Sequence, residues 1–273
     1  MLLSKKQRRR GRQETRQVRR GIYILPNLLT TANLFCGFYG IIASIKHDFK
    51  TAAIAIIISC LFDILDGKVA RFTGADSRFG LEYDSLADLV AFGLGPALLV
   101  YLWALEPFGR LGWVAAFIFV ACGALRLARF NVQVSSVSKK YFVGLPIPAA
   151  ACMVATTVLI FYHLKGSGPT KHLLLLAMTY LLGFLMVSNV TYSSFKEFDW
   201  FQKMPFRSFV LTILLFSVIA VQPSIMLFTL AIIYVSSGPV GYARRMLKSH
   251  LSMPPQPEET LNQDPSTSEK GTQ

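Results

Sequence analysis

Four aspartates that fall in two pairs are the residues of this chain best suited to chemistry. They are Asp63, Asp66, Asp84 and Asp88. The first two are three positions apart and the last two are four apart, so each pair would lie on one face of a helix. Four carboxylates pressed together cannot all stay ionised without compensating positive charge. Oxygen ligands with no His or Cys among them favour Mg²⁺ or Mn²⁺, and four carboxylates suit two ions better than one.

The residues between the two pairs suit the binding of phosphate. Gly67 lets a ligand approach the backbone closely, and Arg71 carries a guanidinium fork that matches phosphate oxygens. Gly74 and Gly80 lie in the turn that joins the pairs. A site with two metal ions grips phosphate and activates an oxygen nucleophile. The stretch 63–88 therefore predicts phosphoryl-transfer chemistry.

The composition of the chain indicates a polytopic membrane protein. Of its 273 residues, 53% are hydrophobic and 16% are charged, and the mean hydropathy is +0.46. The formal net charge is +13, but nine of the 28 Lys and Arg residues lie in the first 20 positions and most of the others flank apolar runs. This distribution fits a membrane surface and not a nucleic acid. Charged groups at the edge of hydrocarbon are costly unless paired or metal-bound, which marks the aspartates as functional.

The apolar runs predict an all-α fold with about eight transmembrane helices. Lys and Arg are retained on the cytoplasmic side of membranes. If the N-terminus is cytoplasmic, the outer segments hold only Lys46, Lys50, Arg110, Lys165 and Lys171. We therefore expect both termini to be cytoplasmic and the aspartates to form a cytoplasm-facing polar site between helices. The expected spans are 28–45, 51–72, 84–104, 111–131, 147–163, 172–190, 207–221 and 223–239.

Three regions are expected along the chain. Residues 1–25 form a basic cytoplasmic arm that would lie against anionic headgroups. Residues 26–240 form one membrane-embedded domain. Residues 241–273 form a cytoplasmic tail, whose end is rich in Pro, Ser, Thr, Gln and Glu and is expected to be disordered because it has almost nothing to bury.

The pattern D-x2-D-G-x2-A-R-x8-G-x3-D-x3-D resembles the signature of the CDP-alcohol phosphatidyltransferases. This resemblance implies a helical membrane enzyme with a two-metal site open to the cytoplasm. Such an enzyme joins an alcohol to the phosphatidyl group of a CDP-linked lipid and releases CMP, and the resemblance also suggests a homodimer. The chain matches every fixed position, at Asp63, Asp66, Gly67, Ala70, Arg71, Gly80, Asp84 and Asp88.

The same resemblance implies roles for individual residues. Asp63, Asp66 and Asp84 resemble metal ligands. Asp88 resembles the residue that touches the second metal and takes the proton from the attacking hydroxyl. The segment after Pro26 is similar to a P-N-x2-T stretch that walls the nucleotide pocket, although Pro-Asn before an apolar run is also an ordinary helix start. The implied contacts to CDP-diacylglycerol are Gly67, Arg71, Ser77, Asn27, Thr30 and Thr31.

Three further stretches resemble the integral-membrane phosphatidylserine synthases of this family and imply L-serine as the acceptor. They are PNLLTTANLFCGFYG (26–40), GALRLARFNV (123–132) and FVGLPIPAAA (142–151). Serine requires a counter-charge for its carboxylate. Arg126 and Arg129 share one face of a helix end, beside Asn131, and either could supply it. The same arginines are equally well explained as positive-inside anchors.

Two alternatives to serine transfer remain open. The first is the same chemistry with glycerol 3-phosphate, inositol phosphate or choline as the acceptor. The second is a cation transporter, which would favour acids near the bilayer midplane and inverted repeats, and neither is evident in the sequence. For catalysis we expect direct displacement, because the single HxK triplet, His163-Leu164-Lys165, lies on the outer face and lacks a following Asp. The expected location is the inner or plasma membrane if the protein is bacterial.

Overall fold

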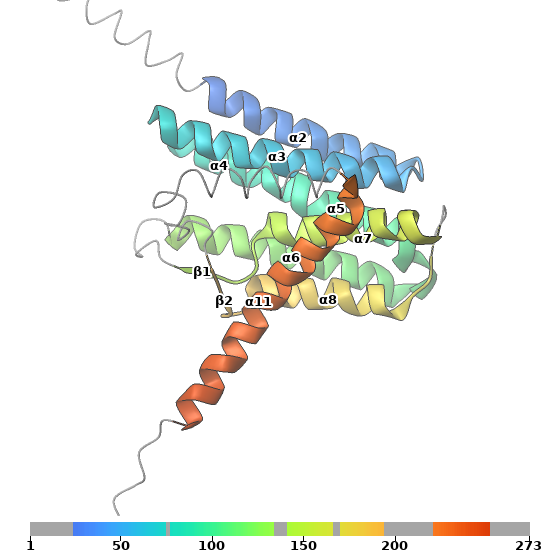
Figure 1. Ribbon diagram of the computed structural model, residues 1–273. Helices are drawn as coiled ribbons and strands as arrows, with labels where there is room; N and C mark the ends of the chain where they lie inside the picture. The colour runs from blue at the N-terminus through green and yellow to red at the C-terminus, as the bar shows by residue number, and fades with distance from the viewer. Residues whose placement is uncertain (1–23, 75–76, 134–140, 166–169, 194–220, 252–273) are drawn as a thin grey trace, which may run out of the picture.

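A computed structural model describes residues 24–74, 77–133, 141–165, 170–193 and 221–251 (Figure 1). This part of the chain is mostly helical. The basic arm lies outside it except for its last two residues, as does the end of the tail. The principal helices are α2 (Ile24–Ile45), α3 (Phe49–Thr73), α4 (Arg78–Asp88), α5 (Gly95–Val100), α6 (Arg110–Gln133), α7 (Ile147–Lys165), α8 (Leu173–Val187) and α11 (Pro223–Leu251).

The all-α membrane fold predicted from the sequence is confirmed. Five helical segments among the described residues are long and apolar enough to cross a membrane. They are Ile24–Ile45, Arg78–Phe108, Arg110–Val132, Ile147–Leu164 and Pro223–Arg245. Helix α8 is apolar but shorter, and α3 is long but carries the charges of the candidate site. The count of eight spans stays a prediction, because 207–220 lies outside the described residues.

The third span is a composite of several helix types. Helix α4 passes directly into the π-helix η1 (Leu89–Leu94), then into α5, and a second π-helix, η2 (Tyr101–Leu105), follows. Single π turns are frequent near functional sites, since they shift the register of side chains along a helix. Here the first π-helix begins at the residue after Asp88. The span also starts earlier than predicted, at Arg78, because Ser77 caps α4 by accepting a hydrogen bond from Gly80 N at 2.9 Å.

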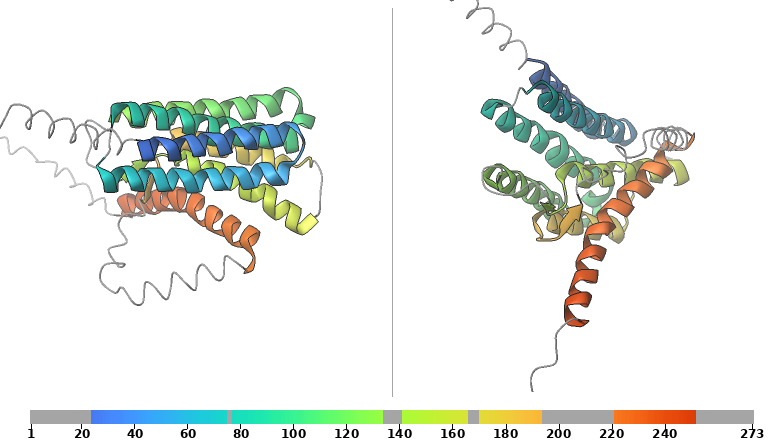
Figure 2. Two further views of the ribbon diagram at one scale, coloured as in Figure 1. Left: turned by 90° about the horizontal axis from the view of Figure 1, so that it is seen from above. Right: turned by 60° about the vertical axis from the view of Figure 1, so that its left-hand side comes forward.

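The helices run roughly along one direction as a bundle, and α11 lies against one side of it (Figure 2). The C-terminal part of α11 projects away from the other helices (Figure 1). This helix continues to Leu251, past the domain boundary expected at 240. The beginning of α2, the end of α3, the beginning of α4 and the end of α6 all lie at the same end of the bundle.

A two-stranded antiparallel sheet at that same end was not predicted. Strand β1 (Tyr141–Val143) pairs antiparallel with β2 (Thr191–Ser193). Tyr192 is buried and its hydroxyl donates to the backbone oxygen of Val235 in α11 at 3.2 Å. Strands of three residues carry too little alternation to be recognised in a sequence. Burial raises the pKa of Tyr192 to about 12, which is consistent with a structural role for its hydroxyl.

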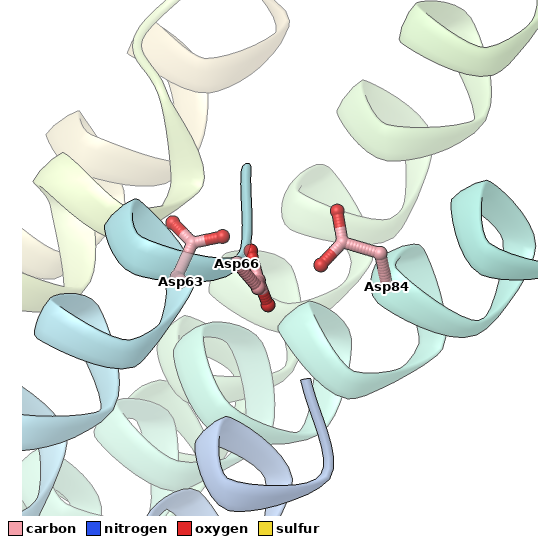
Figure 3. Close-up of side chains that lie close together, drawn as sticks. All are labelled: Asp63, Asp66 and Asp84. Carbon is pink, nitrogen blue, oxygen red and sulfur yellow. The ribbon is translucent and has the colours of Figure 1, made fainter. Parts of the chain in front are cut away.

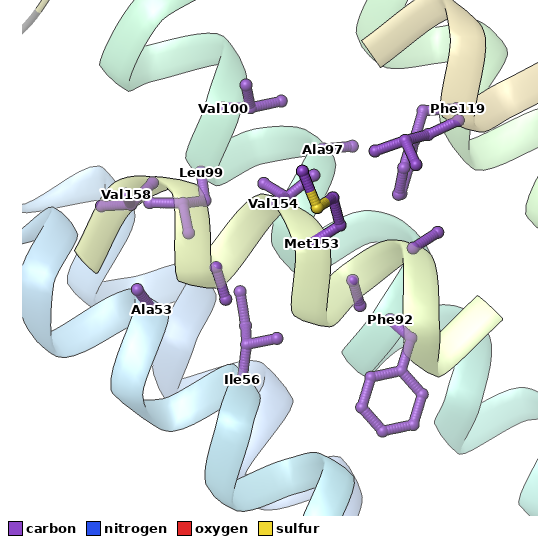
Figure 4. Packing of buried hydrophobic residues seen from close by; sticks show 14 of the residues in the cluster. Ala53, Ile56, Phe92, Ala97, Leu99, Val100, Phe119, Met153, Val154 and Val158 are labelled. Carbon is purple, nitrogen blue, oxygen red and sulfur yellow. The ribbon is translucent and has the colours of Figure 1, made fainter. Parts of the chain in front are cut away.

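The core is built from small and branched residues where α7 packs against α3 and against α5 (Figure 4). Ile56 of α3, Leu99 of α5 and Val158 of α7 are completely buried there. Small residues let helix backbones approach closely, and close packing is the main source of helix association in lipid. Fully buried alanines at these contacts include Ala52, Ala53, Ala91, Ala150, Ala151 and Ala155.

Gly37 marks the tightest contact between α2 and the third span. A Cβ added at Gly37 would lie 2.5 Å from both Cα and Cβ of Ala91. We expect Gly37→Ala to force the two helices apart and to lower stability by about 1–3 kcal/mol. Thermal unfolding in detergent measures the loss. Gly241→Ala is the matched control, because an added Cβ there meets nothing within 4 Å. Equal melting temperatures for the two variants would contradict the prediction.

Candidate active site

Three of the four predicted aspartates come together between two helices. Asp63 and Asp66 project from α3 and Asp84 projects from α4, and the three side chains point toward one another (Figure 3). One carboxylate oxygen from each residue lies within 4.8 Å of the other two. Asp66 is buried, and the other two are half-buried. Both helices pack against α2, and this packing brings the acids of α3 and α4 to one place.

The donor set of this cluster fits a hard divalent cation. All three groups offer only carboxylate oxygen, which Mg²⁺ and Mn²⁺ prefer. Oδ1 of Asp84 is buried and has no hydrogen-bond partner within the described part of the chain. A buried carboxylate oxygen without a partner is costly unless a cation or another donor satisfies it. Oδ1 of Asp84 is thus available to bind a cation.

Asp66 is held in place by Thr30 of α2. The Thr30 hydroxyl lies 3.0 Å from Oδ2 of Asp66 and 3.1 Å from the backbone oxygen of Pro26, and it can donate to either. Thr30 was predicted to contact the nucleotide. In the structure its hydroxyl supports the orientation of a candidate metal ligand, as outer residues of metal sites commonly do, and its contact with the nucleotide stays a prediction.

Asp88 is not one of the three clustered carboxylates, but it lies close enough to interact with their charges. Its side chain is 8% exposed, and the charges of Asp63 and Asp84 act on it. Nδ2 of Asn33 in α2 donates to Oδ1 of Asp88 at 3.1 Å. Asn33 was not among the residues predicted from the sequence. The available signal was a lone amide inside an apolar span, because polar residues at membrane depth are functional candidates.

Gly67 and Arg71 lie near the end of α3, and Ser77 lies at the start of α4. Nε of Arg71 donates to the Gly67 backbone oxygen at 2.7 Å, and the Arg71 side chain is exposed. A Cβ added at Gly67 would meet only the Arg71 guanidinium, at 3.8 Å. The Ser77 hydroxyl oxygen is engaged as the cap of α4. The backbone at Gly67 is therefore open to a ligand, with a guanidinium beside it.

Asn27 and Thr31 border the beginning of α4. The Thr31 hydroxyl donates to the Asn27 backbone oxygen at 2.7 Å and lies 2.9 Å from the Tyr83 hydroxyl. A Cβ added at Gly80 would lie 3.5 Å from Oδ1 of Asn27. The start of α2 therefore lies beside α4, and its role in walling the nucleotide pocket stays a prediction. Tyr83 of α4, which contacts Thr31, was not indicated by the sequence.

The three residues expected to bind serine have different partners in the structure. Arg126 of α6 is half-buried, interacts electrostatically with Asp63 and Asp88, and has a buried Nε with no partner among the described residues. Arg129 instead donates to Oδ1 of Asn189 at 3.0 Å. Asn131 donates to the Ser85 hydroxyl at 3.0 Å. Of the three, Arg126 alone combines burial with proximity to the acids.

Known proteins resemble this chain over most of its length. The family model for CDP-alcohol phosphatidyltransferases matches residues 23–190. A CDP-diacylglycerol–serine O-phosphatidyltransferase of Helicobacter pylori is 38% identical over 229 residues, which cover 83% of this chain and 94% of the relative. One of Bacillus subtilis is 36% identical over 174 residues, 63% of this chain and 92% of the relative. An archaetidylserine synthase of Methanothermobacter thermautotrophicus is 36% identical over 170 residues, covering 62% and 69%.

Proposed function

Because the chain belongs to the CDP-alcohol phosphatidyltransferase family, we propose that it transfers the phosphatidyl group of CDP-diacylglycerol to the hydroxyl of L-serine. The products are phosphatidylserine and CMP. The observation that carries this proposal is the cluster of Asp63, Asp66 and Asp84 in a chain whose relatives are named for serine transfer. The protein is an integral membrane enzyme of phospholipid biosynthesis.

The aspartates would hold the cations that this chemistry needs. Asp63, Asp66 and Asp84 are the proposed ligands, with Asp88 as a further ligand for the second of two ions, Mg²⁺ or Mn²⁺. When bound there, divalent cations neutralise charge on phosphoryl oxygens and on the departing CMP. The exposed guanidinium of Arg71 and the open backbone at Gly67 would bind the pyrophosphate of CDP-diacylglycerol. The wall of Asn27, Thr31 and Ser77 would border the nucleotide.

The transfer itself is proposed as a direct displacement. Asp88 takes the proton from the serine hydroxyl, the hydroxyl oxygen bonds to the lipid-bearing phosphorus, and the bond from that phosphorus to the CMP oxygen breaks. A serine hydroxyl is a weak nucleophile without such a base. Arg126 would pair with the serine carboxylate, because its Nε is buried without a partner among the described residues and its charge interacts with Asp63 and Asp88. Arg129 and Asn131 would contribute to serine binding from positions farther from the acids.

The orientation in the membrane is part of the proposal. Lys and Arg are concentrated in the segments expected on the cytoplasmic side. The end of the bundle with the aspartates would therefore face the cytoplasm, where CMP is released and serine is available. The family resemblance adds the expectation of a homodimer.

The choice of acceptor can be tested directly. The purified enzyme in detergent, with CDP-diacylglycerol and Mg²⁺ or Mn²⁺, is incubated in parallel with labelled L-serine, glycerol 3-phosphate, inositol phosphate and choline. We expect labelled lipid from L-serine alone, with rates for the other alcohols lower by about 100-fold or more, since a site built for polar groups rejects ligands that leave them unpaired. Preferential labelling from another alcohol would overturn the serine assignment but not the transfer chemistry.

A further inference from the structure

A hydrogen-bonded chain of three buried residues crosses three helices and ends at Asp88. Ser59 of α3 and Asn33 of α2 are each 0% exposed. The Ser59 hydroxyl lies 2.9 Å from the Asn33 backbone oxygen and in hydrogen-bond contact with Oδ1 of the same residue, and it can donate its one hydrogen to either oxygen. Nδ2 of Asn33 in turn donates to Oδ1 of Asp88. Polar side chains in an apolar span are retained where they make specific bonds of this kind.

The chain of bonds defines which way the Asn33 amide faces. An amide has one acceptor end and one donor end. Ser59 occupies the acceptor end, so the NH₂ group is directed at the Asp88 carboxylate. The reversed amide would place two acceptors against each other, Oδ1 of Asn33 and a carboxylate oxygen. The carboxylate therefore requires the donor end of the amide, and Ser59 on a third helix supports this orientation by contacting the acceptor end.

The backbone geometry brings Asn33 to this distance. Gly37 lies one helical turn after Asn33, and Ala91 lies about one turn after Asp88. The absence of a side chain at Gly37 allows α2 and η1 to approach until the two turns touch. The hydrogen bond to Asp88 forms one turn away from that contact, toward the acid cluster.

We propose that Asn33, held by Ser59, is a positioning residue for Asp88 in catalysis. The inference rests on the proposed role of Asp88 as the base. Terminal torsions of Asp are broad, so an unsupported carboxylate rotates over a wide range. With Oδ1 held by Asn33, Oδ2 is the oxygen left to receive the proton of the acceptor hydroxyl. Small losses of alignment between reacting groups reduce rates strongly.

The test compares Asn33→Leu, Asn33→Ala and Ser59→Ala with wild type. The leucine variant keeps an apolar side chain of similar length and removes both hydrogen-bonding ends. We expect kcat to fall about 10–100-fold in both Asn33 variants, the usual range for residues that orient an active group, and less in Ser59→Ala. KM for CDP-diacylglycerol and for serine should stay within about 3-fold, because neither residue is proposed to bind substrate.

Two readouts separate positioning from packing. The solvent isotope effect on kcat should increase in the Asn33 variants, because proton transfer to a poorly aligned base becomes slower relative to other steps. The double variant Ser59→Ala with Asn33→Ala should lose no more kcat than Asn33→Ala alone, since Ser59 acts through Asn33. Additive losses, or an unchanged isotope effect, would overturn the inference.

Ser44→Ala is the matched control. Ser44 is also a fully buried serine, but its hydroxyl donates only to the backbone oxygen of Gly40 in its own helix, at 2.8 Å. We expect its kcat to stay near the wild-type value. A loss equal to that of Ser59→Ala would show that any buried serine is needed, which contradicts a specific role.

The variant Asp88→Asn distinguishes failure of this inference from failure of the proposed base. If Asp88→Asn is inactive while Asn33→Leu and Ser59→Ala keep the wild-type kcat, the positioning role is wrong and the base assignment stands. If Asp88→Asn remains active, the base assignment is wrong and the inference falls with it. If the Asn33 variants do not fold, the kcat and the isotope effect of Ser59→Ala decide whether the positioning role holds, because this variant leaves the Asn33 amide in place.

Discussion

Asp88→Asn is expected to reduce kcat to below about 1% of wild type, because removal of a general base costs about 10²–10⁴-fold. The substitution keeps the size of the side chain and an acceptor oxygen for Asn33, so the hydrogen bond seen at Oδ1 can persist. It removes the negative charge and the basic oxygen. Initial rates of phosphatidylserine formation at saturating CDP-diacylglycerol and serine measure the effect. Equilibrium binding of CDP to the same preparation should be partly retained.

Asp48→Asn is the control for that substitution. Asp48 caps α3 at the end opposite to the acid cluster and accepts a hydrogen bond from Thr51 N at 3.1 Å. Asn is an equally good helix cap, so folding and activity should be preserved. More than a few per cent of wild-type kcat in Asp88→Asn would refute the base assignment. Trapping of a phosphatidyl-enzyme adduct, or ping-pong kinetics, would refute direct displacement.

The second large effect is expected for Asp84→Asn, and it has opposite signs for activity and for stability. Asp84 contributes one of three clustered carboxylates and has a buried oxygen without a partner. Without a cation, carboxylates at this distance repel one another. Loss of one charge should therefore raise the melting temperature of the metal-free protein, while activity falls by about 100-fold or more because a ligand is lost.

Metal titration provides the measurement. A ligand that binds only the folded state raises the melting temperature as its concentration rises. After treatment with EDTA, wild type should lose activity and then regain both activity and thermal stability on addition of Mg²⁺ or Mn²⁺. Asp84→Asn should show little of that thermal shift. Glu106→Gln, an exposed acid in the short 3₁₀ turn at Glu106–Phe108, should behave as wild type. Full metal-dependent stabilisation of Asp84→Asn would exclude Asp84 as a ligand.

The candidate site could be predicted to the extent that its residues are local in the sequence. Asp63 and Asp66 share a helix face because of a three-residue interval, and Asp84 and Asp88 share a face of the next helix. Gly74 ends α3 in the left-handed conformation, with φ of 61°. Helices α3 and α4 both pack against α2, which brings Asp63, Asp66 and Asp84 together.

The residues that support the acids could not be predicted in the same way. Thr30 contacts Asp66 across 36 positions of sequence, and Asn33 contacts Asp88 across 55. These pairings depend on how α2 is rotated against its neighbours. Hydrophobic periodicity is weak in a helix that is apolar on all sides, so the sequence does not reveal that rotation. The composite third span and the β1–β2 sheet escaped prediction for related reasons, since neither has a distinctive local pattern.

By itself, the sequence determined the membrane class, the reaction family and the identities of the acids, because composition, spacing and a signature of eight matched positions are properties of the chain alone. Only the tertiary structure decided which polar groups contact those acids. It assigned Thr30 to Asp66 and Asn33 to Asp88, and it separated Arg126 from Arg129 and Asn131. The physical reason is that a hydrogen bond requires a separation near 3 Å, and that separation arises from helix packing set by contacts such as Gly37 against Ala91.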